Sequence, residues 1–77
     1  MKVRFRGIDD IERFISMASR ISSDVFVGSG SRVIDGKSSV GMMQLSFNKE
    51  YELSFVDRDP METDAFIELL KEKGIAL

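Results

Sequence analysis

Two groups of side chains in this sequence could take part in chemistry. One is a cluster of carboxylates near the N-terminus, Asp9, Asp10 and Glu12, and the other is the serine pair Ser38 and Ser39. The 77 residues include no histidine and no cysteine, so the usual zinc ligands and the usual nucleophile–base pairs are missing from the sequence. No acidic loop has the spacing that binds calcium. We therefore predict no catalytic residue, no metal site and no cofactor.

The acidic cluster is explained by the start of a helix. Asp9 is placed to cap this helix, and Glu12 follows at the spacing of a capping box. Carboxylates in a first turn also interact favourably with the helix dipole. A general acid/base pair would need a cleft and a partner group, and the sequence indicates neither. We interpret the cluster as helix caps.

The hydrophobic pattern predicts an alternation of strands and helices. Strands are expected at residues 2–6, 24–28, 31–35 and 50–56, and helices near residues 9–21, 38–46 and 60–73. The order βαββαβα suggests an α+β domain in which helices cover one face of a sheet. The apolar positions predict a core made of Ile11, Phe14, Ile15, Leu53, Phe55, Phe66, Leu69 and Leu70. We expect residues 1–77 to form a single domain.

The last helix carries clear end signals. Asp59 is a capping residue, Pro60 suits the first helical position, and Glu62 has the spacing that completes a capping box. Gly74 suits the left-handed residue that often closes a helix. These signals predict both ends of the helix independently of its apolar stripe.

The charge and hydropathy of the chain favour a cytoplasmic protein. It has 11 basic and 13 acidic side chains and a net charge of −2, which points to no particular polymer as a partner. The longest apolar runs are a few residues, too short to span a membrane. The basic N-terminus is followed by no apolar segment of the kind found in signal peptides. We expect no contact with a membrane.

The basic residues permit one alternative function. Lys2, Arg4 and Arg6 alternate along the first strand, and Arg13 and Arg20 follow in the first helix. Together they could serve a small sheet-based nucleic-acid-binding domain. The acidic total and the lack of exposed aromatic pairs for base stacking argue against it. Salt-dependent binding of RNA would identify this class.

Three segments of the chain resemble the HPr phosphocarrier family. Residues 22–25 (Ser-Ser-Asp-Val) resemble the family's Asn/Asp-Ser-Asp-Ile opening of the second strand. Residues 36–45 (Gly-Lys-Ser-Ser-Val-Gly-Met-Met-Gln-Leu) resemble the family's regulatory-serine motif, Lys-Ser-Ile-Met-Gly-Val-Met-Ser-Leu. The last helix is similar through Asp64, Ala65, Leu69, Leu70 and Gly74. The resemblance implies an open-faced β-sandwich, with three helices on one face of a four-stranded antiparallel sheet.

The sequence departs from this family at the active-site loop, which reads Gly-x-His-x-Arg-Pro with the histidine at the start of the first helix. Counting back without gaps from Ser23 and Asp24 places Gly7 at the histidine position. Anchoring on Gly7 and Ile8 instead places Asp9 there. The resemblance therefore implies a paralogue that cannot carry phosphate on an imidazole. The acidic first turn would repel a phosphoryl group and occupy its amide donors, and an aspartyl-phosphate at Asp9 is the alternative chemistry.

The resemblance also singles out residues around the middle helix. Ser38 matches the regulatory serine, the target of a dedicated kinase, although Ser38 or Ser39 could also simply cap the helix. Val40 and Met43 match positions of an exposed apolar docking patch, with core packing as the alternative for both, whereas Met42 and Leu45 are expected in the core. The implied function is a regulatory or protein-interaction module. Its implied partners are proteins, among them a serine kinase and a transcriptional regulator.

Overall fold

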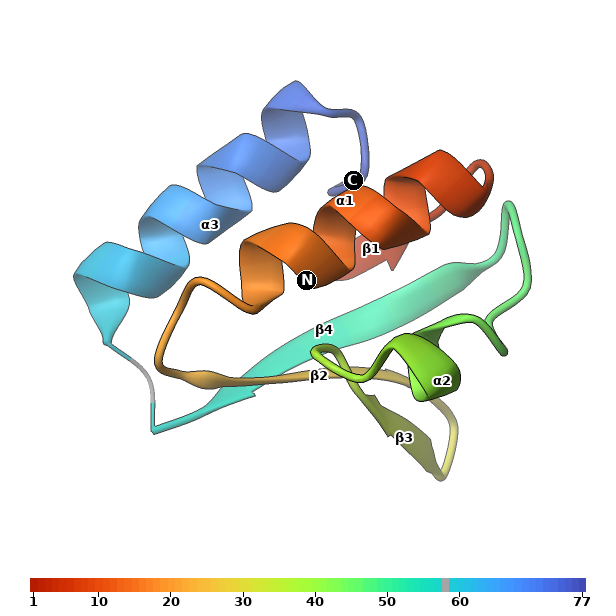
Figure 1. The fold of residues 1–77 in the computed structure, drawn as a ribbon, viewed down its shortest axis with the longest axis horizontal. Helices are drawn as coiled ribbons and strands as arrows, with labels where there is room; N and C mark the ends of the chain where they lie inside the picture. Colours follow the sequence, from red (N-terminus) through yellow and green to blue (C-terminus); the bar gives the residue numbers. More distant parts are fainter. Residues whose placement is uncertain (58) are drawn as a thin grey trace.

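The computed structural model describes residues 1–57 and 59–77, and its ribbon is drawn in Figure 1. Its elements are β1 (Lys2–Arg4), α1 (Ile8–Ala18), β2 (Asp24–Ser29), β3 (Arg32–Asp35), α2 (Ser39–Met42), β4 (Glu50–Val56) and α3 (Pro60–Glu72). The strands form one antiparallel sheet in the order β1-β4-β2-β3. The βαββαβα order and the antiparallel sheet beneath three helices confirm the predicted fold class. Within the described residues, no helix is both long enough and apolar enough to cross a membrane.

The long strand β4 lies at the centre of the sheet because it pairs on both sides. It meets β1 through the pair Val3 and Tyr51, and it meets β2 through the pair Val27 and Leu53. In β2 and β4 the side chains alternate between buried and accessible positions, as expected for a sheet with one covered face. Beyond β1, the bridge of Val3 to Ala76 and two backbone hydrogen bonds hold the end of the chain.

The predicted start of the first helix needs correction. Helix α1 begins at Ile8 with Gly7 as its N-cap residue, and no side chain caps it, so Asp9 is not the cap. The neighbouring carboxylate of Asp10 folds back onto the backbone N–H of Arg6 at 2.9 Å. The helix also ends at Ala18, three residues earlier than expected. The backbone hydrogen bonds of Arg20 and Ile21 reach back only three residues, which is the pattern of a 3₁₀ turn and not of an α-helix.

The predicted ends of the two other helices are confirmed in part. Asp59 accepts a hydrogen bond from the N–H of Met61 at 3.1 Å, and Gly74 has φ of +75°, both as predicted. Glu62 does not complete the capping box, since its carboxylate accepts hydrogen bonds from the loop after α1. Helix α2 has four residues rather than nine, and tighter turns replace it after Met42. The neighbouring Gly41 is a residue of low helix propensity.

Four aromatic rings form a chain through the core between the sheet and α1 and α3. Phe14 meets Phe5 and Phe66 with ring centroids 5.4 Å apart in each case, and Phe66 meets Phe55 at 6.0 Å. All three contacts are edge-to-face, a geometry that aromatic pairs favour. Phe14 therefore joins the core at α1 to the core at α3.

Most of the predicted core residues are buried. Fully or almost fully buried are Ile11, Phe14, Leu53, Phe66 and Leu70, and half-buried are Ile15 and Phe55. Leu69 was expected in the core, but it is 43% exposed. The buried face of α3 is formed by Thr63, Phe66 and Leu70, and Leu69 lies beside this face. Leu69 instead lines a groove between α1 and α3.

Candidate functional site

The loop before α2 holds Ser38 in a defined position. The side chain of Asp35 accepts a hydrogen bond from the N–H of Lys37 at 2.9 Å, and its carbonyl accepts one from the N–H of Ser38 at 3.0 Å. The ammonium group of Lys37 donates to the carbonyl of Ile21 at 2.7 Å. This turn places Ser38 at the N-cap of α2, where its hydroxyl oxygen accepts a hydrogen bond from the N–H of Gly41 at 3.2 Å. The predicted cap is Ser38 and not Ser39.

Helix α2 lies directly against β3. A Cβ atom at Gly41 would come within 2.9 Å of the Cγ2 atom of Ile34, closer than real Cβ contacts allow. Glycine at this position therefore lets the helix approach the strand. This close packing determines which face of α2 is buried.

The side chains of this short segment divide between core and surface as the family resemblance implies. Met42 is fully buried and Leu45 nearly so, whereas Val40 is 75% exposed and Met43 is 42% exposed. A third apolar side chain in the segment, Phe47, is also exposed. Phe47 was not predicted to be exposed, although its position beside the polar turn at Asn48 is a usable signal. The α2 surface, defined as Ser38, Val40 and Met43, thus joins a hydroxyl to two exposed apolar groups.

The start of α1 has a different chemistry. The carboxylate of Asp10 accepts hydrogen bonds from Arg6 Nε at 2.8 Å and from Arg6 Nη2 at 3.1 Å, and Arg13 Nη1 lies 3.8 Å away. Asp10 is almost fully buried. The hydrogen bonds from Arg6 lower the pKa of this carboxyl, and the same pair raises the pKa of Arg6. Arg6 also donates to the carbonyl of Lys73, so this ion pair ties α1 to the end of α3.

Both positions considered for the missing histidine lie at the start of α1. Gly7 is the N-cap residue, with extended backbone and no atom within 4 Å of a Cβ built on it. Asp9 lies inside the helix and is exposed. The expectation that carboxylates satisfy the first amides is wrong, since α1 has no side-chain cap. The carboxylate of Asp10 is instead occupied by Arg6, which neutralises part of the acidic first turn.

The basic residues of the nucleic-acid alternative do not form one surface. Lys2 lies 3.9 Å from a carboxylate oxygen of Glu52, and Arg6 and Arg13 both lie against Asp10. Lys2 and Arg4 belong to β1, whereas Arg13 and Arg20 belong to α1 and the turn after it. Three of the five cations are thus paired with carboxylates, and no single face collects them.

Comparisons with known proteins agree with this fold. The family model described as the PTS HPr component phosphorylation site matches residues 10–72, so neither Gly7 nor Asp9 falls within it. No curated protein sequence matches the chain significantly.

Two similar solved structures carry the same architecture. The structure of HPr-C-His from Thermoanaerobacter tengcongensis has a TM-score of 0.75 at 21% identity, with 100% of this chain and 97% of that chain covered. Crh, a catabolite repression protein of Bacillus subtilis whose structure is an intertwined dimer with a swapped domain, has a TM-score of 0.68 at 23% identity, covering 97% and 87% of the two chains. The fold is shared with both proteins, and the match over residues 10–72 identifies the chain as a member of the HPr phosphocarrier family of the phosphotransferase system.

Proposed function

We propose that this chain is a cytoplasmic, non-carrier member of the HPr family that acts as a regulatory protein-interaction module. The α2 surface is its docking site, and Ser38 is its phosphorylation site. In this proposal residues 1–77 work as one domain without catalytic activity or a cofactor. The observation that carries the proposal is the position of the Ser38 hydroxyl at the start of α2, next to two apolar side chains that point away from the core.

The absence of the carrier reaction rests on the residues at the start of α1. A phosphocarrier histidine acts as a nucleophile that titrates near neutral pH, and this sequence contains no histidine. The carboxylate of Asp10 is held by Arg6 and is almost fully buried, which leaves it poorly placed to attack a phosphoryl donor. Asp9 is exposed, and no cation of the described structure forms an ion pair with it. Nothing at this helix start replaces the imidazole.

The regulatory role rests on what a phosphate at Ser38 would change. The serine oxygen already accepts a hydrogen bond from the N–H of Gly41, and a phosphate there would offer stronger acceptors to the same turn. It would also add nearly two negative charges next to Val40 and Met43. Modification would therefore change the recognition properties of the surface without requiring the fold to open.

The chemistry of the α2 surface indicates the kind of partner. Exposed Met43 suits an adaptable apolar contact, and Val40 adds a second apolar group. A partner with an apolar groove and a nearby arginine would distinguish the phosphorylated form from the unmodified form. A serine kinase and a transcriptional regulator are the partners that fit this arrangement and the family.

The test is phosphorylation by an HPr-type serine kinase with ATP, measured as the intact mass of the protein. We expect one phosphate on the wild type, one on Ser39→Ala and none on Ser38→Ala. Ser39→Ala is the matched control because Ser39 is the adjacent, exposed hydroxyl. An unmodified wild type, or a phosphate that persists in Ser38→Ala, would refute the assignment of this site.

A further inference from the structure

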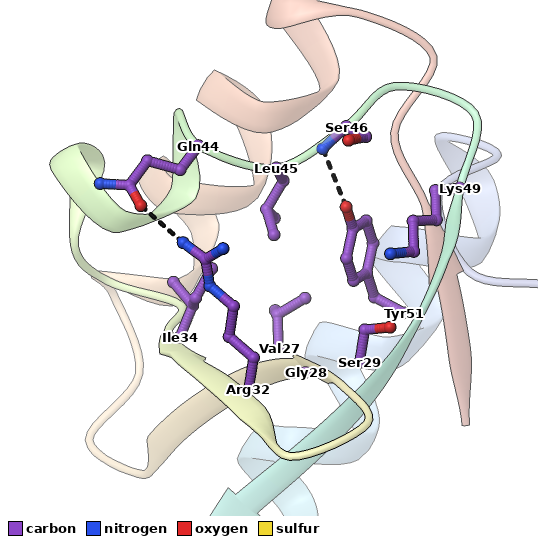
Figure 2. Close-up of a pocket in the computed structure, with 10 residues that line it drawn as sticks. All are labelled: Val27, Gly28, Ser29, Arg32, Ile34, Gln44, Leu45, Ser46, Lys49 and Tyr51. Atoms are coloured by element: carbon purple, nitrogen blue, oxygen red, sulfur yellow. Dashed lines mark hydrogen bonds between the residues drawn. The ribbon is translucent and has the colours of Figure 1, made fainter.

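A cavity of about 140 Å³ lies beyond the end of α2. Figure 2 shows its walls: the β2–β3 hairpin at the bottom, the segment after α2 at the top, and the start of β4 at the right. Val27, Ile34 and Leu45 contribute apolar side chains to a lining that is otherwise largely polar. Since a water molecule needs roughly 10–15 Å³ of such space, the cavity has room for a small solute.

The charged side chains of this cavity are all basic. Arg32 lines one side and Lys49 lines the other, and none of the ten lining residues is acidic. Within the described residues, neither cation lies within 4 Å of a carboxylate oxygen. The depression at the start of α1 differs, because its two arginines share the carboxylate of Asp10. The α2 cavity therefore holds two positive charges without a local counter-charge.

Several N–H and O–H groups that line the cavity have no hydrogen-bond acceptor among the described residues. Arg32 Nη2 donates to Gln44 Oε1 at 2.7 Å, which orients the guanidinium and uses one of its five N–H groups. The Tyr51 hydroxyl accepts a hydrogen bond from the N–H of Ser46 at 2.8 Å. Its own O–H has no acceptor among the described residues, although the tyrosine is almost fully buried. Lys49 Nζ lies over the Tyr51 ring, 5.4 Å from its centre, and this cation–π contact keeps the ammonium at the wall of the cavity.

We propose that this cavity binds a small oxyanion of the phosphate type, held between Arg32 and Lys49. A phosphate dianion accepts hydrogen bonds, and it matches both the excess of donors and the two cations that have no carboxylate partner among the described residues. Gln44 would position Arg32, and the Tyr51 hydroxyl would complete the set of donors. The proposal does not depend on phosphorylation of Ser38. Because Gln44, Leu45 and Ser46 directly follow α2, bound phosphate would also order the segment next to the α2 surface.

The test is a titration of the isotopically labelled protein with inorganic phosphate, followed by backbone amide NMR at constant ionic strength with sodium chloride. Saturable shifts are expected at the amides of residues 28–32, 44–46 and 49–51. Arg32→Gln and Lys49→Gln should each weaken binding about tenfold, which is the effect of losing one charge-assisted hydrogen bond.

Lys2→Gln is the matched control, because it removes the same charge from the β1 side of the sheet. It should leave the affinity for phosphate unchanged within about twofold, since exposed charges at a distance are screened by salt. Equal weakening in Lys2→Gln and Arg32→Gln would show that only net charge matters and would overturn the proposal. Shifts that do not saturate, or that follow the other basic residues of the surface, would overturn it as well.

Discussion

The start of α1 and the segment around α2 differ in whether their basic side chains are paired with a carboxylate. At α1, Arg6 and Arg13 both form ion pairs with the buried carboxylate of Asp10, so their positive charge is partly balanced within the protein. Around α2, Arg32 and Lys49 have no carboxylate partner among the residues that the structure describes, and apolar side chains are exposed. We propose that this chain meets a partner and an anion in the α2 region and not at the start of α1.

The largest effect is expected in the core that supports α1. Phe66 is 2% exposed and its ring packs against Phe14 and Phe55. Phe66→Ala should lower the free energy of unfolding by about 3–5 kcal/mol, because it leaves a cavity that the surroundings fill only in part. Urea denaturation measures this change. Leu69→Ala is the control on the same helix, and a loss as large as that of Phe66→Ala would contradict the observed orientation of α3.

The second effect concerns the carboxylate at the start of α1. Asp10→Ala removes the acceptor for three hydrogen bonds from Arg6. Because donors near the core lose their partner, the free energy of unfolding should fall by about 1–3 kcal/mol. Asp9→Ala removes the same charge from an exposed position and should change stability by about 0.5 kcal/mol or less. Equal destabilisation of the two variants would contradict the importance of the hydrogen bonds between Arg6 and Asp10 for stability.

The acid dependence of stability should report the same carboxylate together with Glu62. Hydrogen bonds from Arg6 lower the pKa of Asp10 below its ordinary 3.8, and hydrogen bonds from Ser22 and Ser23 lower the pKa of Glu62 below its ordinary 4.5. Lowered pKa values in the folded state mean that both carboxylates stabilise the protein above these ordinary values. The stabilisation is lost as the pH falls through the lowered values.

Denaturation at a series of pH values checks this expectation. The free energy of unfolding should decline as the pH falls below about 4.5. The decline should be shallower in Asp10→Asn and in Glu62→Gln than in the wild type. A decline of the same steepness in both variants would mean that other groups control acid unfolding.

The smallest effect is expected on the α2 surface. Met43→Ala should change the free energy of unfolding by about 0.5 kcal/mol or less, because the side chain is largely exposed. The neighbouring Met42→Ala should cost about 2–5 kcal/mol, because Met42 is fully buried. The two methionines form a matched pair for thermal or chemical denaturation. A large loss in Met43→Ala would assign that residue to the core and weaken the case for a docking surface.

The parts of the molecule predicted from sequence depend on local signals. Asp59 and Gly74 mark the ends of α3 because caps need only the residues of one turn. The exposure of Met43 beside the buried Met42 was implied by the family resemblance and not by a local signal. Ser38 was one of two candidates for the cap, and the turn at Asp35 selects it.

The parts that were not predicted depend on contacts between distant segments. Glu62 has a capping-box spacing, yet its carboxylate binds Ser22 and Ser23, 40 and 39 residues away. Asp10 was grouped with the caps, because the sequence does not show that Arg6 would turn back toward it. The α2 cavity was also missed, since its cations come from β3 and from the turn before β4. These features become visible only when the sheet and helices are assembled.

The central claim is that this protein receives phosphate at Ser38 and does not carry it at the start of α1. It is tested most directly by measuring the intact mass after two parallel incubations. One uses phosphoenolpyruvate with the first enzyme of the phosphotransferase system, and the other uses ATP with an HPr-type serine kinase. The account predicts no adduct in the first incubation and a single phosphate, absent from Ser38→Ala, in the second. A stoichiometric adduct in the first incubation that disappears in Asp9→Ala would contradict it, because that carboxylate would then act as a phosphocarrier.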